Sequence, residues 1–449
     1  MAATNQLRRA HKPEDIFKLA AEDRSHVMRG GQWISQATKL YLTNLDYPYV
    51  QALCSANAPN LRVLRIFSQD NLAIMRIPQG IFAGSVPAGL AELYLSHVAI
   101  QKHSPFLGVS CASLSTLELD GCGRIWDTQG QLCDALHDLP NLARLALGNS
   151  MPPTPSSRPN RTRLPHLLDL SFIAHPQAAI SFLHCIEYRS NIIIDIELEL
   201  RHGHMPHADL QTLGRILHGR YDRAPGSSAQ ALYVRLHEGT SYTQGNVGLV
   251  TEFFLAGRTP QSNLPRQSRL SFAHRDHVHP QDWHAMVACL ATAFPLYRVG
   301  ILCLKLDVYA PQFPCLQILN LSGDLRELYL EKQAAPCFVA QMGTQLAAFE
   351  PQLARLMTLT VEDCDLPNKA GANGSPNGVT IVRMLRSAFI ERNFSGIQPS
   401  RRHLYIKGCD LHSHTLLLKD QPYTFPEYSD PRSPPIIWIM RPGSTQRQW

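Results

Sequence analysis

Charge is scarce in this sequence of 449 residues: Asp, Glu, Lys and Arg make up 17% of it, whereas apolar residues make up 44%. So little charge is atypical of a disordered chain, and the apolar share is enough for a large core. No segment approaches the roughly 18 apolar residues of a membrane span. The best candidate, residues 191–200, is short and carries three acids. We therefore expect no transmembrane helix and no membrane partner.

The N-terminus also lacks the apolar stretch of a secretory signal. The 11 cysteines include no Cys-x-x-Cys pair. In a long chain without a secretory signal, scattered cysteines are typical of buried thiols rather than of a disulfide framework. We expect an intracellular protein, cytoplasmic or nuclear.

Motifs for nucleotide or hydrolytic chemistry are missing as well: there is no phosphate-binding G-x-x-x-x-G-K-[ST], no G-x-G-x-x-G, no G-x-S-x-G and no H-E-x-x-H. The 20 histidines include two clusters, His202–His204–His207 and His274–His277–His279–His284. Both lie in expected loops, where spacing alone does not bring together the three or four ligands that zinc needs. We expect no catalytic residues, no metal site and no cofactor.

What the sequence does contain is a repeated pattern: apolar, two residues, apolar, one residue, apolar. Its last apolar position recurs at Leu42, Ile66, Leu95, Leu119, Leu147 and Phe172. The intervals are 24, 29, 24, 28 and 25 residues, within or at the edge of the leucine-rich-repeat period of about 20–29 residues. The alternation of apolar and polar residues inside each copy is typical of a half-buried strand.

Short amphipathic helices are predicted between these strands. Apolar residues share one helical face in residues 130–139, 178–188, 208–218, 282–294 and 378–389. Strands and helices that alternate at this period predict an α/β fold, a leucine-rich-repeat solenoid (horseshoe). We expect its parallel sheet on the concave face and its helices on the convex face.

The chain is expected to have three regions. Residues 1–34 would flank or cap the repeats, residues 35–418 would form the solenoid, and residues 419–449 would form a Pro-rich irregular tail. Two stretches rich in Pro, Gly and Ser, near 151–165 and 368–378, predict loop insertions.

After residue 172 the repeats become irregular. We place their strands at Leu198, Val234, Phe272, Leu304, Leu321, Val361 and Ile406. A further match ends at Leu330, only nine residues after Leu321. Either one of these two matches is not a strand, or a hairpin interrupts the repeats there.

Three copies share a cysteine three residues after the last apolar position: Cys122 after Leu119, Cys364 after Val361 and Cys409 after Ile406. A small side chain there can tuck under the turn that leaves the strand. This pattern resembles the cysteine-containing leucine-rich repeat of F-box proteins. Over residues 35–410 the chain resembles fungal F-box/leucine-rich-repeat proteins, whose solenoid is of the ribonuclease-inhibitor-like kind. The resemblance implies a substrate receptor of a ubiquitin ligase, in which the F-box binds a Skp-type adaptor and the repeats bind the target.

The N-terminus departs from that family. Residues 13–17 resemble the start of an F-box and Trp33 resembles its closing tryptophan, but residues 18–32 lack the apolar density of the family's helices. We therefore expect at most a degenerate F-box remnant and no binding of a Skp-type adaptor.

The residue between the last two apolar positions of each copy should point into the concave face, because side chains alternate along a strand. Five copies place tyrosine there: Tyr41, Tyr94, Tyr233, Tyr329 and Tyr405. Charged residues of both signs share this face: Arg65, Glu118, Asp120, Arg235, Lys305, Asp307, Glu331, Glu362 and Lys407. Tyrosine is enriched at binding hot spots but also suits a sheet surface, so both interpretations stay open.

Mixed signs favour a protein partner over nucleic acid. The sequence therefore predicts a non-catalytic protein-interaction scaffold that binds its partner through the concave face. The alternative is an enzyme whose unrecognised site lies within residues 198–310.

Overall fold

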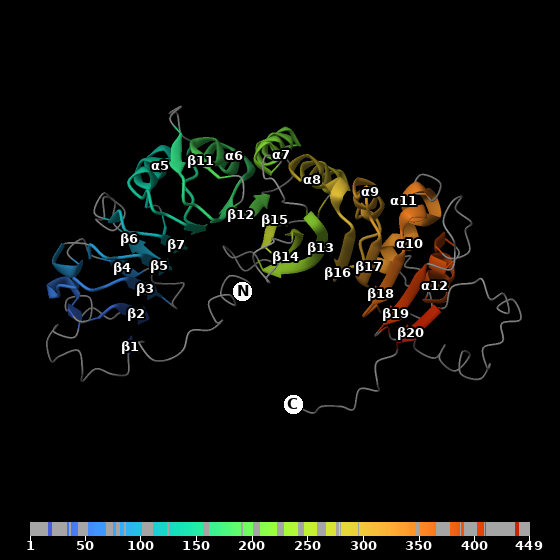
Figure 1. Ribbon diagram of the computed structural model, residues 1–449, viewed down its shortest axis with the longest axis horizontal. Coiled ribbons are helices and arrows are strands. Elements are labelled where there is room, and N and C mark those ends of the chain that lie inside the picture. The colour runs from blue at the N-terminus through green and yellow to red at the C-terminus, as the bar shows by residue number, and fades with distance from the viewer. Residues whose placement is uncertain are drawn as a thin grey trace, which may run out of the picture. The chain divides into compact units, whose positions relative to one another are not determined.

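The computed structural model describes residues 17–19, 34–35, 37–43, 53–68, 75–77, 81–84, 87–100, 111–123, 125–155, 161–189, 192–200, 207–221, 229–240, 247–257, 266–274, 278, 280–294, 296–345, 350–364, 378–386, 388–389, 402–407, 409 and 436–439. The chain divides into two compact units, Met1–Ile196 (unit 1) and Glu197–Trp449 (unit 2). Both combine helices with a large sheet dominated by parallel strand pairs (Figure 1). Within these ranges no helix has the length and apolar character needed to cross a membrane.

Unit 1 is built on a row of strands in chain order. They are β1 (Phe17–Leu19), β2 (Lys39–Thr43), β3 (Val63–Phe67), β5 (Glu92–Ser96), β7 (Thr116–Asp120), β8 (Arg144–Gly148), β10 (Asp169–Ala174) and β12 (Ile193–Leu200), which crosses the boundary between the units. Each neighbouring pair from β1 to β10 is parallel. Because the expected remnant, residues 1–34, falls almost wholly outside the described residues, only β1 and Ile34 represent it.

Helices and two small parallel sheets complete unit 1. They are η2 (Ile81–Gly84), α5 (Gln129–His137), α6 (Pro176–Cys185), the pair β4 (Met75–Ile77) with β6 (Val98–Ile100), and the pair β9 (Thr162–Leu164) with β11 (Ile186–Tyr188). Local sequence explains both α-helices. Thr128 caps α5 by accepting a hydrogen bond from the Gln131 amide, and Pro176 begins α6, where its missing N–H costs nothing.

One backbone pattern recurs in both units. In eight copies the first apolar residue donates its N–H to the carbonyl three residues earlier, which makes a tight turn before the strand. The pairs are Leu61 to Ala58, Leu90 to Pro87, Leu114 to Cys111, Leu142 to Leu139, Leu167 to Leu164, Val299 to Leu296, Leu325 to Ser322 and Leu356 to Leu353. The repeat seen in the sequence is therefore also a repeat of backbone conformation.

At seven positions a single carbonyl then links one parallel strand to the next. The Thr38 carbonyl accepts hydrogen bonds from the amides of both Arg62 and Val63, and the Arg62 carbonyl accepts from Ala91 and Glu92. The same arrangement continues at the carbonyls of Ala91, Ser115 and Ala143, and in unit 2 at Gly300 and Arg326. Because every link uses the same position, the strands align in one register.

Side chains reinforce this alignment just before the first apolar residue. The amide groups of Asn60 and Asn141 donate to the Ser35 and Ala112 carbonyls of the preceding copy, each at 2.9 Å. In unit 2 the Arg355 guanidinium does the same to the Gly323 carbonyl at 2.7 Å.

The leucines between these links form the core of unit 1. Leu64, Leu93, Leu117, Leu145 and Leu170 are at most 1% exposed and lie on adjacent parallel strands. The predicted burial and pairing of these strands are confirmed.

Unit 2 continues with longer strands and more helices. In chain order these are α7 (His207–Tyr221), β13 (Ala229–Thr240), β14 (Val247–Gly257), β15 (Arg266–His274), α8 (Pro280–Ala293), η5 (Leu296–Arg298), β16 (Ile301–Leu306), α9 (Cys315–Leu321), β17 (Glu327–Lys332), α10 (Ala334–Gln345), α11 (Glu350–Arg355), β18 (Thr358–Glu362), α12 (Gly378–Arg386), β19 (His403–Lys407) and β20 (Ile436–Ile439). From β13 with β16 onward to β20, each neighbouring pair is parallel.

An antiparallel insertion interrupts this row. The spatial order is β12-β15-β14-β13-β16, and β14 is antiparallel to both β13 and β15. The prediction of successive repeat strands at Val234 and Phe272 was wrong in topology, because the unpredicted strand β14 returns the chain between them. The 11-residue β14 is apolar enough to pair on both sides, a property that the repeat pattern does not reveal.

Three further expectations are corrected. The match ending at Leu321 is helix α9, and the strand is the match ending at Leu330, within β17. The expected loop 151–165 contains strand β9. The expected irregular tail contains β20, whose apolar sequence Ile-Ile-Trp-Ile pairs with β19. Of the expected loop 368–378, only Gly378 lies in the described part of the chain, and it begins α12.

The three repeat cysteines occupy equivalent positions. The Sγ atoms of Cys122, Cys364 and Cys409 point to the carbonyls of Leu95, Leu330 and Val361, at 3.2, 3.5 and 3.7 Å. Each acceptor is the last apolar residue of the preceding strand. None of the three thiols is in a disulfide; Cys122 and Cys364 are buried, whereas Cys409 is only half-buried. The thiol therefore closes the turn by hydrogen bonding to the neighbouring strand.

Leu117→Ala should lower the free energy of unfolding by about 2–5 kcal/mol, because it removes a fully buried side chain from the middle of the row. Urea unfolding followed by circular dichroism measures the loss. Leu168→Ala is the matched control, since Leu168 is 41% exposed, and we expect a change within about 0.5 kcal/mol. Similar losses for both variants would contradict the assigned core.

The thiols should differ in reactivity. Burial raises the pKa of Cys122 to about 12, whereas a hydrogen bond with Cys364 lowers the pKa of Cys409. In timed alkylation of the folded protein by iodoacetamide, read by peptide mass spectrometry, Cys409 should react at least about tenfold faster than Cys122. The urea-unfolded chain is the control, in which the two rates should converge. Equal rates in the folded protein would show that the Cys409 turn is not as described.

Candidate functional site

The outward face of the unit 2 sheet gathers the predicted binding residues into two rows. One row aligns Arg235, Lys305 and Glu331 on β13, β16 and β17. The other aligns Tyr233, Tyr329 and Tyr405 through Cys303 and Thr360. Strand alternation explains this, because residues two apart on one strand share a face while the leucines between them face the helices.

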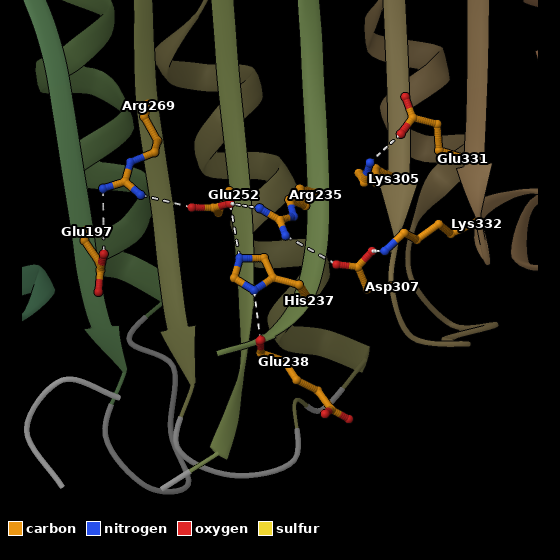
Figure 2. Close-up of polar contacts among 10 residues, drawn as sticks. All are labelled: Glu197, Arg235, His237, Glu238, Glu252, Arg269, Lys305, Asp307, Glu331 and Lys332. Carbon is orange, nitrogen blue, oxygen red and sulfur yellow. Dashed lines mark hydrogen bonds and ion pairs between the residues drawn. The ribbon is translucent and has the colours of Figure 1, made fainter. Parts of the chain in front are cut away.

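Glu252 on β14 is the centre of this face (Figure 2). Its Oε1 atom lies 3.0 Å from Arg269 Nη1, and its Oε2 atom lies 3.1 Å from His237 Nε2 and 3.8 Å from Arg235 Nη1. The carboxylate is buried and is held by cationic groups from β13 and β15. A buried carboxylate needs such partners, because its loss of hydration is otherwise uncompensated.

Further ion pairs extend from this centre across the strands. Arg269 reaches Glu197 on β12 at 3.8 Å. On the other side the Arg235 guanidinium lies 3.5 Å from the Asp307 carboxylate. That carboxylate also pairs with the Lys332 ammonium group at 2.6 Å. Lys305 pairs with Glu331 at 2.7 Å. We call these residues the charged network: Glu197, Arg235, His237, Glu252, Arg269, Lys305, Asp307, Glu331 and Lys332.

The pKa values reflect these contacts. Burial alone would raise the pKa of Glu252, but the hydrogen bond with His237 and the charge of Arg269 outweigh it, so the pKa lies below its ordinary value. The same hydrogen bond raises the pKa of His237, against the opposing effect of burial. Asp307 likewise has a lowered pKa, because Lys332 and Arg235 outweigh its burial. The network therefore holds Glu252 and Asp307 ionised and favours protonated His237.

The tyrosines of unit 2 differ in exposure. Tyr233 is 43% exposed, one of few large hydrophobic side chains left so open among the described residues. Tyr329 is half-buried and donates its hydroxyl to Glu327 at 3.0 Å. Burial and this carboxylate raise the pKa of Tyr329 to about 12. Tyr405 is half-buried, with its ring 6.0 Å from that of His403.

In unit 1 the predicted residues form a compact cluster. The Arg65 guanidinium lies over the rings of Tyr94 at 4.1 Å and Tyr41 at 5.1 Å, and it pairs with Glu92 at 3.7 Å. The Tyr94 hydroxyl donates to Glu92 at 3.0 Å. The expectation that Tyr94 is solvent-facing was wrong: it is 7% exposed, because Arg65 covers its ring. Tyr94 therefore serves the fold more than an open surface.

The remaining predicted residues of unit 1 lie on β7. Glu118 is 3.6 Å from Arg144, which also binds Asp169. Burial raises the pKa of Glu118 despite that arginine. Asp120 ends β7 and lies against Gly148, where an added Cβ would come within 2.7 Å of its Oδ1 atom. Glu118 lies beside the Arg65 cluster, because it is the register neighbour of Tyr94 on the adjacent strand and the charge of Arg65 acts on its carboxylate.

Sequence reasoning found Arg235, Lys305, Asp307 and Glu331 but missed Glu197, His237, Glu252, Arg269 and Lys332. The best available signal was Glu252 itself, a lone acid in the apolar run Leu249–Leu255. A charge in such a setting is rarely buried without a partner. The identity of that partner depends on the pairing of β13, β14 and β15.

Of the two histidine clusters, the side chains of His207 and His284 lie in the described part, and His284 Nδ1 is 2.6 Å from Gln317 Oε1. No group of three or more metal-ligating side chains occurs among the residues described. Comparison of the sequence with protein-family models finds no match, and comparison with curated proteins also finds none.

His237→Gln should destabilise the protein more near pH 5.5 than near pH 8.5. Since the folded pKa of His237 is raised above about 6.5, protonated His237 contributes fully below the unfolded pKa. That contribution is lost as the pH rises through the folded pKa. Glu252, whose pKa is lowered, stays ionised at both values. We expect the two losses of unfolding free energy to differ by about 1 kcal/mol in urea titrations.

The control for this experiment is His218→Gln, because His218 is exposed on α7. Its effect should be small and equal at both pH values. If His237→Gln cost the same at both, the hydrogen bond between His237 and Glu252 would not be charge-assisted.

Proposed function

We propose that this chain is a leucine-rich-repeat protein of the F-box/leucine-rich-repeat type, which binds a protein partner through the polar face of its sheet. Three observations support the repeat assignment: the turn before each strand, the carbonyl that links successive strands, and the cysteine under the turn. Each recurs at the same position of the sequence pattern. Repeats of this kind bury their leucines only by stacking, and stacked strands create an extended binding face.

The single observation that carries the binding proposal is Tyr233. It leaves 43% of its surface open beside Arg235, on a face where Tyr329 and Tyr405 are only half-buried but less exposed than Tyr233. Tyrosine and arginine are the side chains most enriched at interface hot spots. An aromatic ring next to a held guanidinium is therefore a natural anchor for a partner.

Chemistry at this face supports binding rather than catalysis. Both ring nitrogens of His237 are engaged, Nε2 with Glu252 and Nδ1 with the Glu238 carbonyl at 3.0 Å. Burial and Glu331 raise the pKa of the neighbouring Cys303 thiol, which makes it a poor nucleophile. We accordingly propose a receptor role related to ubiquitin-ligase subunits, with no adaptor binding by residues 1–34.

Photocrosslinking tests this proposal. A benzophenone amino acid placed at position 233 should capture a discrete protein from cells, identified by mass spectrometry, whereas the same probe at position 297 should not. Tyr297 is the matched control, because it is 54% exposed but lies on the 3-10 helix η5 rather than on a strand of the sheet. Equal capture at both positions, or none at 233, would overturn the proposal.

With the captured partner purified, Tyr233→Ala should weaken binding by about 2 kcal/mol, as expected for loss of a central aromatic anchor. Titration calorimetry measures the change, and Tyr297→Ala should leave affinity unaltered. Tyr233→Ala should also leave the melting temperature nearly unchanged, since an exposed side chain loses few contacts. Unchanged affinity would mean that Tyr233 is simply a residue suited to a sheet surface.

A further inference from the structure

In the charged network, the negative side chains lie closer to the sheet and the positive side chains lie closer to the solvent. In each of the seven ion pairs among the described residues of unit 2, the cationic side chain is more exposed than its carboxylate partner. Arg235 is 44% exposed above Glu252 at 8%, and Lys332 is 45% exposed above Asp307 at 20%. Lys305 at 37% stands above Glu331 at 23%. The acids lie near the strands and the cations cover them.

Side-chain length explains this layering. Aspartate and glutamate are short and stay close to the sheet, whereas arginine and lysine reach over neighbouring strands and keep their charged ends in water. Arg235, for example, extends between Glu252 on β14 and Asp307, the residue that follows β16 (Figure 2). An approaching ligand therefore meets N–H donors first.

The N–H donors of these cations are held in place, but some of them make no hydrogen bond to the described residues. Among the described residues Arg235 makes one side-chain hydrogen bond, from Nη2 to Asp307 at 3.5 Å, although a guanidinium has five N–H groups. The carboxylates beneath fix its position, so a ligand would bind it at little cost in side-chain entropy. Tyr233, two residues earlier on β13, places an exposed ring beside it.

From these observations we infer that the partner segment bound at this face is an extended acidic peptide, with its carboxylate or phosphate groups on Arg235, Lys305 and Lys332. The inference rests on the proposed function and specifies its ligand. The three cations lie on β13, β16 and β17, so they span about 10 Å, two strand spacings. Alternate side chains of an extended peptide are about 7 Å apart, so two acidic residues separated by one residue fit within this span.

Nucleic acid fits this face less well. Its binding depends on a net positive field and the release of counterions. Here every exposed cation has a carboxylate directly beneath it, so the network is close to neutral as a whole. A short acidic peptide needs nearby N–H donors rather than a strong positive field. The face supplies such donors. A basic peptide would meet the cations before it could reach the acids.

The test measures fluorescence anisotropy of three labelled peptides with the full-length chain: alternating Glu-Ser, alternating phosphoserine-Gly and alternating Lys-Ser. We expect either anionic peptide to bind at least about tenfold tighter than the lysine peptide, and the ratio of the two anionic affinities distinguishes carboxylate from phosphate. A single-stranded RNA of similar length is the fourth probe. RNA that binds more tightly than both anionic peptides would overturn the inference, as would equal binding of the lysine peptide.

Variants connect the binding to these residues. Arg235→Gln and Lys332→Gln should each weaken the anionic peptide at least about fivefold. Arg215→Gln on α7, an exposed arginine of the same unit, should leave affinity unchanged. Lys332→Gln is the variant less prone to misfold, because among the described residues the Lys332 side chain pairs only with the partly exposed Asp307. Melting curves verify that each variant is folded. Full affinity in both folded variants would overturn the inference.

The outcomes remain separable from the proposed function. Crosslinking at position 233 without any preference for anionic peptides would preserve a binding face and reject its acidic ligand. Loss of both results would reject the face itself.

Discussion

The structure depends on a backbone carbonyl that, at seven links between parallel strands, accepts two amide N–H groups from the start of the next strand. This link fixes the register, and register decides which face each side chain occupies, since a slip of one residue would turn every leucine outward. With the register fixed, Leu64, Leu93 and Leu117 stack without exposure, while Arg65 and Glu118 align on the opposite face. The cysteine turns follow from the same constraint, because the thiol of Cys122 can reach the Leu95 carbonyl only when neighbouring strands end level.

The antiparallel insertion of unit 2 is what distinguishes its face. Parallel repeats alone would place Arg235 beside Lys305, two like charges in register. Strand β14 brings Glu252 to the other side of Arg235, and β15 brings Arg269 to Glu252. Asp307, directly after β16, is the second carboxylate that pairs with Arg235 and balances its charge. The antiparallel insertion thus supplies the carboxylate that offsets the repulsion among closely spaced cations on one sheet.

In the charged network each carboxylate is more buried than the cationic side chains that pair with it. The carboxylates meet the requirement that buried charges be paired, and the longer cationic chains keep contact with water. Unit 1 shows a different solution at Arg65, which is itself mostly covered and lies on two tyrosine rings. The same outward positions therefore serve two purposes: in unit 1 they close the surface over Tyr94, and in unit 2 they leave Tyr233 and Arg235 accessible.

Local pattern determined most of unit 1. The spacing of leucines was enough to predict strands β2, β3, β5, β7, β8 and β10, their parallel order, the helix at Gln129–His137 and the equivalence of the three cysteines, because each depends on contacts between adjacent repeats of one period. Tertiary structure decided the rest. The leucines of α9 fit the same spacing as a strand, and only packing made them helical. The partner of Glu252 and the covering of Tyr94 by Arg65 depend on which strands become neighbours and on how far long side chains reach across them. Those are properties of pairing between distant segments, and periodicity along the chain does not contain them.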